Sequence, residues 1–214
     1  MPSRSLYLYR GSAAKALSQL KYQKRLCMLG PLCDAMVVAL GDPMIYRDVD
    51  IVVPVPASRY GFMKRGFNQS ALMADFLGRY LDVPVERQIL QRRGSKQQVG
   101  LGRFERRRNA QISFGPGRSF YRAAGKHVLL FDDVFTTGAT VKTCESVLKD
   151  GGADVSIITF ARRAPEHIEH LIVDRSIGSE HLFPIQSERG PVKVACDASR
   201  FPYDKRTRSD IPGF

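Results

Sequence analysis

The residues best suited to chemistry form one short run, residues 128–141. Two adjacent acids, Asp132 and Asp133, follow an apolar stretch, and small hydroxyl residues with one glycine come next. Carboxylates accept hydrogen bonds from the two neighbouring hydroxyls of a ribose, and hydroxyl groups and closely approaching backbone bind phosphate. The hydroxyl residues and the glycine that follow the two acids lie in the run Thr136, Thr137, Gly138, Ala139 and Thr140. Acceptors for a diol followed by a phosphate cradle predict a ribose 5-phosphate site.

The flanking segments predict that this run lies at the binding edge of a parallel sheet. Residues 127–133 are typical of a buried strand, residues 139–150 of a helix closed by Gly151, and residues 155–160 of another strand. This order predicts a βαβ unit and a parallel, doubly wound α/β sheet. Ligands bind outside the carboxyl ends of such strands, and helix N-termini bind anions. The run is not a Walker A loop, because that spacing and its lysine are missing.

Two helices are predicted near the N-terminus. Ala13, Leu17 and Leu20 share one helical face, and a second helix covers residues 28–40 before Gly41 ends it. Three regions follow from these patterns: residues 1–45 as a helical segment packing on the core, 46–171 as the core, and 172–214 as an irregular tail.

Within the core, the short β-branched run that begins at Asp50 predicts a buried strand. This strand is expected to end at Pro54, because proline cannot donate to a ladder. Asn68 suits the N-cap of a helix. Helical spacing on one face behind this cap is shared by Leu72, Phe76 and Tyr80. Residues 91–118, rich in glycine and charge, are interpreted as a long mobile loop with a short helical piece.

The charge is unevenly distributed. The chain has 33 basic and 21 acidic residues, and residues 1–131 alone hold 22 basic against 8 acidic ones. Such an excess indicates an anionic partner: nucleic acid, a phosphorylated metabolite or an acidic membrane face. Few, irregularly spaced cysteines and the lack of an apolar run of about 18 residues predict a cytoplasmic protein without a membrane span.

Several motifs together resemble those of one family. The run VLLFDDVFTTGAT resembles the phosphoribosyl pyrophosphate (PRPP) signature of type I phosphoribosyltransferases. The segment VVPVPASRYGFMKRGFNQSALMADFLG resembles the PVP…RGFNQ stretch of the ComF family, and QQVGLGRFERRRNAQISF and LSQLKYQK resemble two further stretches of that family. The resemblance covers about residues 6–164 and implies a type I phosphoribosyltransferase-like parallel sheet flanked by helices. The residues themselves predict the N-terminal helices and an irregular C-terminal tail, and the tail has no counterpart in the family pattern.

The resemblance also implies roles for particular residues. Asp132 and Asp133 would hold the ribose hydroxyls of PRPP, and residues 136–140 its 5-phosphate. The loop after the strand at residues 50–54 would bind pyrophosphate through Ser58, Arg59 and Arg65. Mg²⁺ would be coordinated by PRPP oxygens and water, with no ligand from the protein.

Residues 91–109 correspond in position to the flexible loop that closes over PRPP in type I enzymes. Arg103 and Arg107 are expected to act with the acid pair in catalysis, and Gln98 and Asn109 are further candidates in this loop. ComF-family members commonly begin with a Cys-rich, zinc-ribbon-like module. Cys27 and Cys33 lack zinc-ribbon spacing and two partners, so no structural zinc is expected.

Two functions remain open from the sequence. The first is a Mg²⁺-dependent phosphoribosyltransferase linked to DNA uptake, as the ComF resemblance implies. The second is a non-catalytic competence factor that binds single-stranded DNA or the uptake machinery, with PRPP as a regulatory or vestigial ligand. The basic residues exceed what a small metabolite requires, which keeps nucleic acid as a candidate partner. A homodimer is left open.

Overall fold

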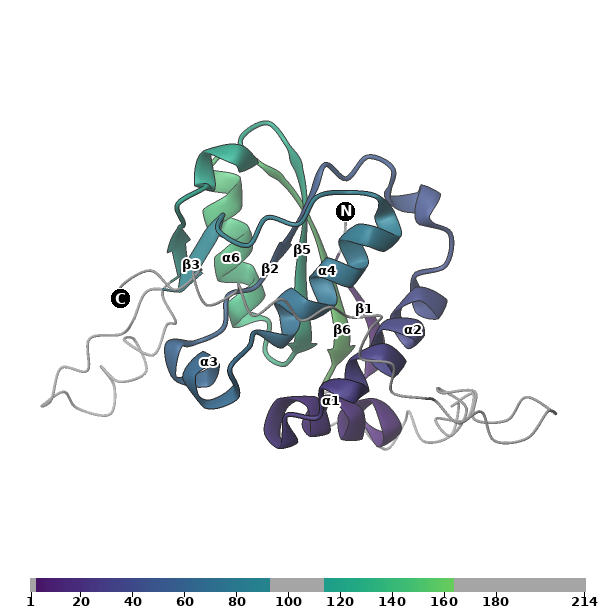
Figure 1. The fold of residues 1–214 in the computed structure, drawn as a ribbon. Helices are drawn as coiled ribbons and strands as arrows, with labels where there is room; N and C mark the ends of the chain where they lie inside the picture. Colours follow the sequence, from purple (N-terminus) through teal and green to yellow (C-terminus); the bar gives the residue numbers. More distant parts are fainter. Residues whose placement is uncertain (1–2, 93–113, 164–214) are drawn as a thin grey trace, which may run out of the picture. The chain divides into compact units, whose positions relative to one another are not determined.

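The centre of the protein is a four-stranded parallel sheet with strand order β1-β6-β5-β2 (Figure 1). The computed structural model describes residues 3–92 and 114–163. The strands are β1 (Arg4–Leu8), β2 (Ile51–Pro54), β5 (His127–Phe135) and β6 (Asp154–Arg162). Because every pair is parallel, the carboxyl ends of all four strands share one edge of the sheet.

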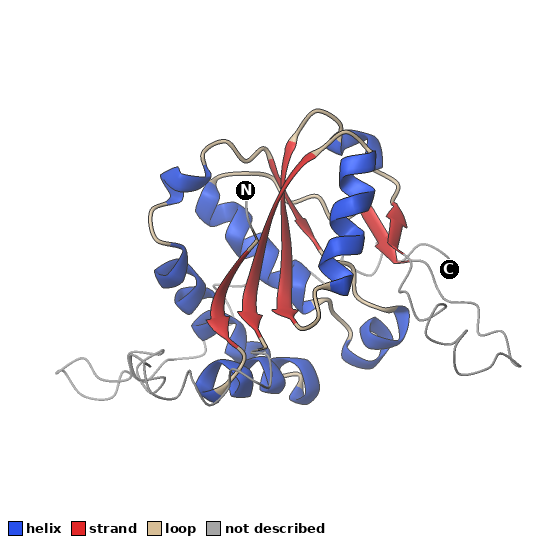
Figure 2. Cartoon of the chain, turned by 180° about the vertical axis from the view of Figure 1, so that it is seen from behind, coloured by secondary structure: helices blue, strands red, loops and turns tan. Residues whose placement is uncertain are grey.

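Helices cover both faces of the sheet (Figures 1 and 2). Helix α6 (Ala139–Asp150) buries Val141, Cys144 and Leu148 on one face. The antiparallel pair β3 (Leu90–Arg92) and β4 (Phe114–Pro116) contributes to the same core. The other face carries α2 (Leu29–Leu40) and α4 (Gln69–Leu81), with α1 (Gly11–Gln23) near the carboxyl edge. Shorter 3₁₀ turns span Leu26–Met28, Pro43–Tyr46 and Phe120–Ala123.

Two side-chain caps fix the segment that follows β2. The Ser58 hydroxyl accepts a hydrogen bond from the backbone N–H of Gly61 (2.9 Å) and starts the short helix α3, Arg59–Arg65. The Asn68 side chain accepts from the N–H of Ser70 (3.2 Å) and donates to the carbonyl of Val55 (3.0 Å). Asn68 therefore both starts α4 and ties that start to the end of β2, at the carboxyl edge of the sheet.

Most elements predicted from the sequence are confirmed. Helices occupy the predicted N-terminal region, and Ala13, Leu17 and Leu20 are buried on α1. The strand at residues 50–54 ends at proline as predicted, and Asn68 is the cap of α4. Helix α6 begins and ends at the predicted residues, between two parallel strands. The predicted parallel α/β class is therefore the observed one.

Four local features differ from the prediction. Strand β1 pairs with β6 where no strand was predicted, and α3 forms where a loop was expected. At the ends of the predicted loop 91–118, residues 91–92 and 114–116 lie in the antiparallel ladder; residues 93–113 lie outside the described part of the chain. The buried face of α4 includes Met73, Ala74 and Leu77, whereas Leu72, Phe76 and Tyr80 are half-buried.

The chain divides into two units, Met1–Phe183 and Pro184–Phe214, and every described residue belongs to the first. The predicted tail, residues 172–214, lies outside the described residues.

Candidate functional site

The two acids of the central motif lie at the end of β5, where its neighbour β2 has just ended. The ladder between β2 and β5 stops at the pairing of Pro54 with Phe131, one residue before the acids. Asp132 and Asp133 are only 8% and 7% exposed. The protein thus buries two adjacent carboxyl groups at the carboxyl edge of its sheet, where parallel α/β folds bind ligands.

The first turn of α4 supplies a hydrogen-bond donor to each acid. The hydroxyl of Ser70 donates to Oδ1 of Asp132 (3.0 Å), and Nε2 of Gln69 donates to Oδ2 of Asp133 (2.6 Å). The backbone N–H of Asp133 also donates to Oδ1 of Asp132, and that of Val134 to Oδ1 of Asp133. Buried carboxyl groups need such partners, because desolvation of their charge is costly.

One cation from a distant part of the sequence approaches the pair. Nζ of Lys21, in the last turn of α1, lies 3.9 Å from Oδ2 of Asp133. Neither Lys21, Gln69 nor Ser70 was assigned a role from the sequence. The sequence nevertheless contains a signal for two of them. Lys21 lies in the L-K-Y stretch and Gln69 in the RGFNQ stretch, and both stretches carry the family resemblance.

The electrostatics of the pair are asymmetric. Burial raises the pKa of Asp132 well above its ordinary value, and the neighbouring charge of Asp133 raises it further. The hydrogen bonds from the Asp133 N–H and from Ser70 act in the opposite direction, but they are smaller effects. Like charges at this separation cannot both ionise easily, so the pair holds a proton more readily than an isolated carboxyl.

The predicted phosphate loop connects the acid pair to α6. Gly138 has φ +77°, and a Cβ on it would lie 2.4 Å from Cζ of Phe135. A glycine is therefore needed both for the left-handed backbone and for the ring beneath it. Helix α6 starts at the next residue with no acid in its first turn, so its N-terminal N–H groups remain a favourable place for an anion.

The side chains around this loop are open to solvent. Thr136, Thr137 and Ala139 are exposed, and Thr140 is half-buried. The Thr137 hydroxyl accepts a hydrogen bond from the N–H of Ala139 (3.4 Å), a long contact that a phosphate oxygen could replace. The structure therefore brings the predicted phosphate-loop residues together behind the acid pair.

The predicted pyrophosphate residues cluster on α3, which follows β2. The guanidinium of Arg65 folds back along the helix, since a Cβ on Gly61 would lie 2.8 Å from both Nη2 of Arg65 and Oγ of Ser58. Nε of Arg65 is buried and has no hydrogen-bond partner. Arg59 is exposed at the first position of the helix. Four other candidates lie outside the described residues, namely Gln98, Arg103, Arg107 and Asn109.

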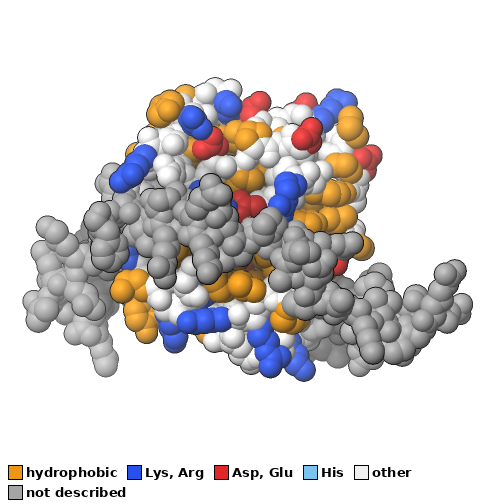
Figure 3. Space-filling model, in the orientation of Figure 1, with side chains coloured by type: hydrophobic (Ala, Val, Ile, Leu, Met, Phe, Trp, Pro, Cys, Tyr) orange, Lys and Arg blue, Asp and Glu red, His pale blue; other side chains and the backbone are white. Residues whose placement is uncertain are grey.

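The surroundings of this edge are basic. Figure 3 shows lysine and arginine side chains along the lower edge of the view, where α1 and α3 lie in Figure 1. On α3 the exposed residues are Arg59, Tyr60, Met63 and Lys64. A surface of this charge attracts anions and raises their local concentration.

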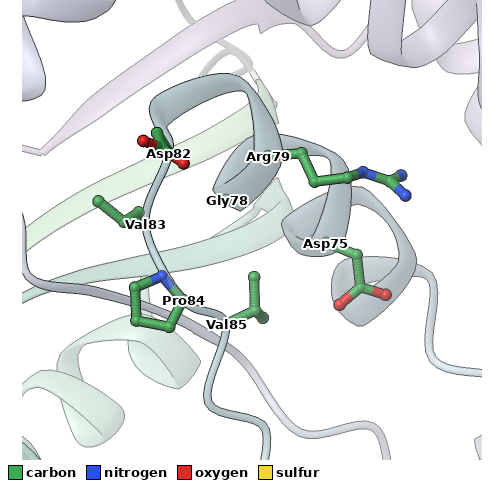
Figure 4. Close-up of a pocket in the computed structure, with 7 residues that line it drawn as sticks. All are labelled: Asp75, Gly78, Arg79, Asp82, Val83, Pro84 and Val85. Atoms are coloured by element: carbon green, nitrogen blue, oxygen red, sulfur yellow. The ribbon is translucent and has the colours of Figure 1, made fainter.

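A surface cavity of about 520 Å³ lies elsewhere, at the opposite end of α4 from the acid pair (Figure 4). It is lined by Asp75, Gly78, Arg79, Asp82, Val83, Pro84 and Val85. Asp75 is already paired with Arg87 there, and the lining contains no residue of the predicted site. This cavity is distinct from the acid pair and its loop.

Two classes of structure are not found among the described residues. Within residues 3–92 and 114–163, no group of three or more His, Cys, Asp or Glu side chains could hold a metal ion. None of the helices described in these ranges is long and apolar enough to cross a membrane.

The fold and site define a parallel α/β protein whose buried acid pair leads directly into a helix N-terminus. The chain is 28% identical over 142 residues to competence protein F of Haemophilus influenzae, covering 64% of this chain and 62% of the relative. It is 28% identical to competence protein ComFC of Bacillus subtilis, covering 74% and 62%. These similarities confirm the resemblance to the ComF family that the motifs predict.

A third relative is the DNA utilization protein YhgH of Escherichia coli O157:H7, which is 33% identical over 53% of this chain and 49% of the relative. The chain thus spans about half to three fifths of the length of these curated relatives. No family model matches the chain.

Among solved structures, similar chains include two phosphoribosyltransferases. The adenine enzyme of Saccharomyces cerevisiae matches with a TM-score of 0.41 and 16% identity, covering 66% of this chain and 72% of that one. A hypoxanthine enzyme of Staphylococcus aureus matches with a TM-score of 0.36 and 13% identity, covering 64% and 73%. The fold class rests on the parallel sheet itself.

The buried Asp132 carboxyl predicts a pH dependence of stability. Because its pKa is raised in the folded state, the folded chain binds more protons than the unfolded chain above about pH 4, and the free energy of unfolding falls as the pH rises. Asp132→Asn keeps an oxygen for Ser70 and cannot ionise. We expect it to melt at least about 3 °C above wild type near neutral pH, a shift that 1 kcal/mol produces at this chain length.

Thermal unfolding followed by circular dichroism across this pH range checks the expectation. The advantage should shrink toward about pH 4, where both chains carry a neutral side chain at this position. Asp154→Asn, which changes an exposed acid at the start of β6, serves as the control and should show no such trend. An Asp132→Asn variant that is no more stable than wild type near neutral pH contradicts the assignment.

The loop geometry predicts a difference between two glycine substitutions. Gly138→Ala and Gly125→Ala both place a side chain at positive φ, but a Cβ on Gly125 would meet nothing within 4 Å. Each should lose about 1–2 kcal/mol from left-handed strain. Gly138→Ala should lose about 1–3 kcal/mol more, because its methyl group would displace Phe135. Equal urea midpoints for the two variants contradict the packing of the loop on this ring.

Proposed function

We propose that the chain is a phosphoribosyltransferase-like protein that binds PRPP together with Mg²⁺ at the carboxyl edge of its sheet. The observation that carries the proposal is a buried acid pair joined by one short loop to the N-terminus of a long helix. Acceptors for hydroxyl groups are thereby followed closely in the chain by an anion site, which is the combination that a sugar diol and its 5-phosphate require.

Each part of the ligand has matching groups in this proposal. Asp132 and Asp133 accept hydrogen bonds from the two ribose hydroxyls, and residues 136–140 with the start of α6 hold the 5-phosphate. Ser58, Arg59 and Arg65 on α3 face the pyrophosphate, to which a guanidinium can donate two parallel hydrogen bonds. The unpartnered Nε of Arg65 supports this role, because it is a donor still available to a ligand once the loop adjusts.

The chemistry would be transfer of the phosphoribosyl group: the bond from C1 of the ribose to pyrophosphate breaks, and a bond from C1 to a nucleophilic acceptor forms, through an oxocarbenium-like centre. Mg²⁺ bound by PRPP oxygens and water would neutralise charge on the leaving group. The chain's own cations would stabilise the departing pyrophosphate. Arg103 and Arg107, which lie outside the described residues, are proposed to act with the acid pair in catalysis.

A calorimetric comparison of two sugars tests the diol assignment. Ribose 5-phosphate and 2-deoxyribose 5-phosphate differ by one hydroxyl, and a hydrogen bond to a charged acceptor contributes about 1.5–3 kcal/mol, or roughly 10- to 150-fold in affinity. We expect wild type to prefer the ribose compound and to bind PRPP with Mg²⁺ more tightly still. Asp133→Asn should lose most of the preference.

Asp154→Asn, far from the site at the start of β6, should retain both affinity and preference. Equal affinity of wild type for the two sugar phosphates, or a folded Asp132→Asn/Asp133→Asn variant that binds PRPP like wild type, contradicts the proposal.

A second candidate function is the binding of single-stranded DNA during DNA uptake, with PRPP as a regulatory or vestigial ligand. The names of the relatives support a link to competence and DNA utilization. The surface of α3 supports a direct contact, because Tyr60 is 76% exposed and lies between exposed Arg59 and Lys64. An exposed aromatic ring on a helix that also carries exposed cations suits a stacked base with phosphates nearby.

A matched pair of tyrosine variants tests this candidate. Tyr60→Ala should weaken binding of an oligothymidylate about fivefold or more, the lower end of what one stacked base contributes. Tyr121→Ala removes a ring of similar exposure (72%) on the 3₁₀ turn before β5 and should leave the affinity unchanged. Affinity measured by fluorescence anisotropy should fall steeply with salt. Equal effects of the two variants, or no salt dependence, exclude α3 as the contact.

A further inference from the structure

The acid pair is not held symmetrically. Asp133 receives a charged and an amide donor from two helices, Lys21 of α1 and Gln69 of α4. Asp132 receives only neutral donors, the hydroxyl of Ser70 and a backbone N–H. Two carboxyl groups next to each other in sequence therefore have different electrostatic surroundings, which separates their protonation behaviour.

Lys21 forms an ion pair with the buried carboxylate of Asp133, and this pair is partly protected from solvent. Its side chain is 32% exposed and that of Asp133 10%, so solvent screens their attraction less than it screens an ordinary surface pair. Nζ of Lys21 also lies 5.9 Å from the centre of the Tyr22 ring, which is a favourable cation–π contact. Helix α1 thereby brings a positive charge to a site built mainly from α4 and β5.

Gln69 is oriented by its hydrogen bond to Asp133, and this orientation leaves its amide oxygen without a partner. The side chain is 4% exposed, Nε2 donates to Asp133, and Oε1 is buried with no hydrogen-bond partner. An unsatisfied buried acceptor lowers stability, because its desolvation is not compensated. The short charge-assisted bond to Asp133 (2.6 Å) offsets this cost, and it needs an ionised acceptor to be strong.

The groups facing Asp132 from the other elements do not provide an equivalent contact. Arg92 of β3 and Cys144 of α6 are close enough to interact electrostatically with Asp132. The thiol is buried, and burial raises its pKa, so it contributes no charge at neutral pH. Arg92 lies over the ring of Phe114 (5.5 Å) and has no hydrogen bond to Asp132 among the contacts of the described residues.

We propose that Lys21 and Gln69 are positioning residues that keep Asp133 ionised and oriented, so that Asp133 is the charged acceptor for the ligand's vicinal hydroxyls while Asp132 keeps the proton. The ligand in this inference is the sugar phosphate of the proposed function, on which it rests. The assignment of the proton to Asp132 agrees with the raised pKa that burial and Asp133 give it. Helix α1 then controls how strongly the site binds a diol, without itself touching the ligand.

Replacing the ammonium group gives a distinctive pH signature. In Lys21→Met the acid pair loses its cation and should take up a proton at higher pH than in wild type. Affinity for ribose 5-phosphate should then fall about two- to fivefold near neutral pH, the range of a partly screened ion pair, and recover as the pH rises. Lys21→Arg should restore the wild-type profile. Lys15→Met, an exposed lysine of the same helix, is the matched control.

Two measurements on the full chain separate this inference from the proposed function. Carbon-13 resonances of the aspartate carboxyl groups, recorded without ligand, report the proton uptake of the pair, and calorimetry with ribose 5-phosphate at several pH values reports binding. Gln69→Met, which keeps the side-chain length but not the donor, should shift the ligand-free titration in the same direction as Lys21→Met.

Unchanged carboxyl titration in both Lys21→Met and Gln69→Met overturns the inference, whatever the ligand affinity. A shifted carboxyl titration in the two variants, together with a wild-type chain that binds no sugar phosphate, supports the positioning role and removes the proposed function. A shifted titration with affinity lost most strongly at low pH supports both. A loss of affinity equal at every pH, or one that Lys15→Met reproduces, contradicts a role through Asp133.

Discussion

The structure depends on one electrostatic constraint, the burial of two adjacent carboxyl groups at the end of β5. Two negative charges cannot both be kept at these positions without compensation. The chain meets the constraint with donors from the first turn of α4 and a cation from the last turn of α1. The pKa of Asp132 is raised by burial, so the pair also takes up a proton more readily than an isolated carboxyl group. Such a pair lowers stability, so its presence points to a function of the site.

The positions of the neighbouring helices are consistent with that constraint. Asn68 hydrogen-bonds both to the start of α4 and to the carbonyl of Val55, which holds Gln69 and Ser70 level with the end of β5. The parallel order β6-β5-β2 brings the segments after β5 and β2 to one edge, so that α3 and the loop before α6 flank the acids. Because Gly138 turns the chain sharply, α6 starts within a few residues of the pair.

Local signals in the sequence predicted the scaffold well, because each is carried by neighbouring residues. The apolar pattern of the sequence indicates strand β5 and helix α6. Asn68 is recognisable as an N-cap because it directly precedes a helical pattern. Strand β1 was missed because it lies at the sheet edge and no residue of it is buried. The buried face of α4 was missed because apolar residues occur on more than one side of it. Lys21 and Gln69 reach Asp133 across more than 60 residues, so only the folded chain shows their role.

Backbone and carboxyl chemical shifts recorded during a titration with ribose 5-phosphate and Mg²⁺ test the central claim most directly. A ribose-phosphate site at this edge predicts that the carboxyl signals of Asp132 and Asp133 and the amide signals of residues 136–140 change together, with one dissociation constant. No change at these positions, or changes confined to the cavity around Asp75 and Arg79 at the far end of α4, would contradict it.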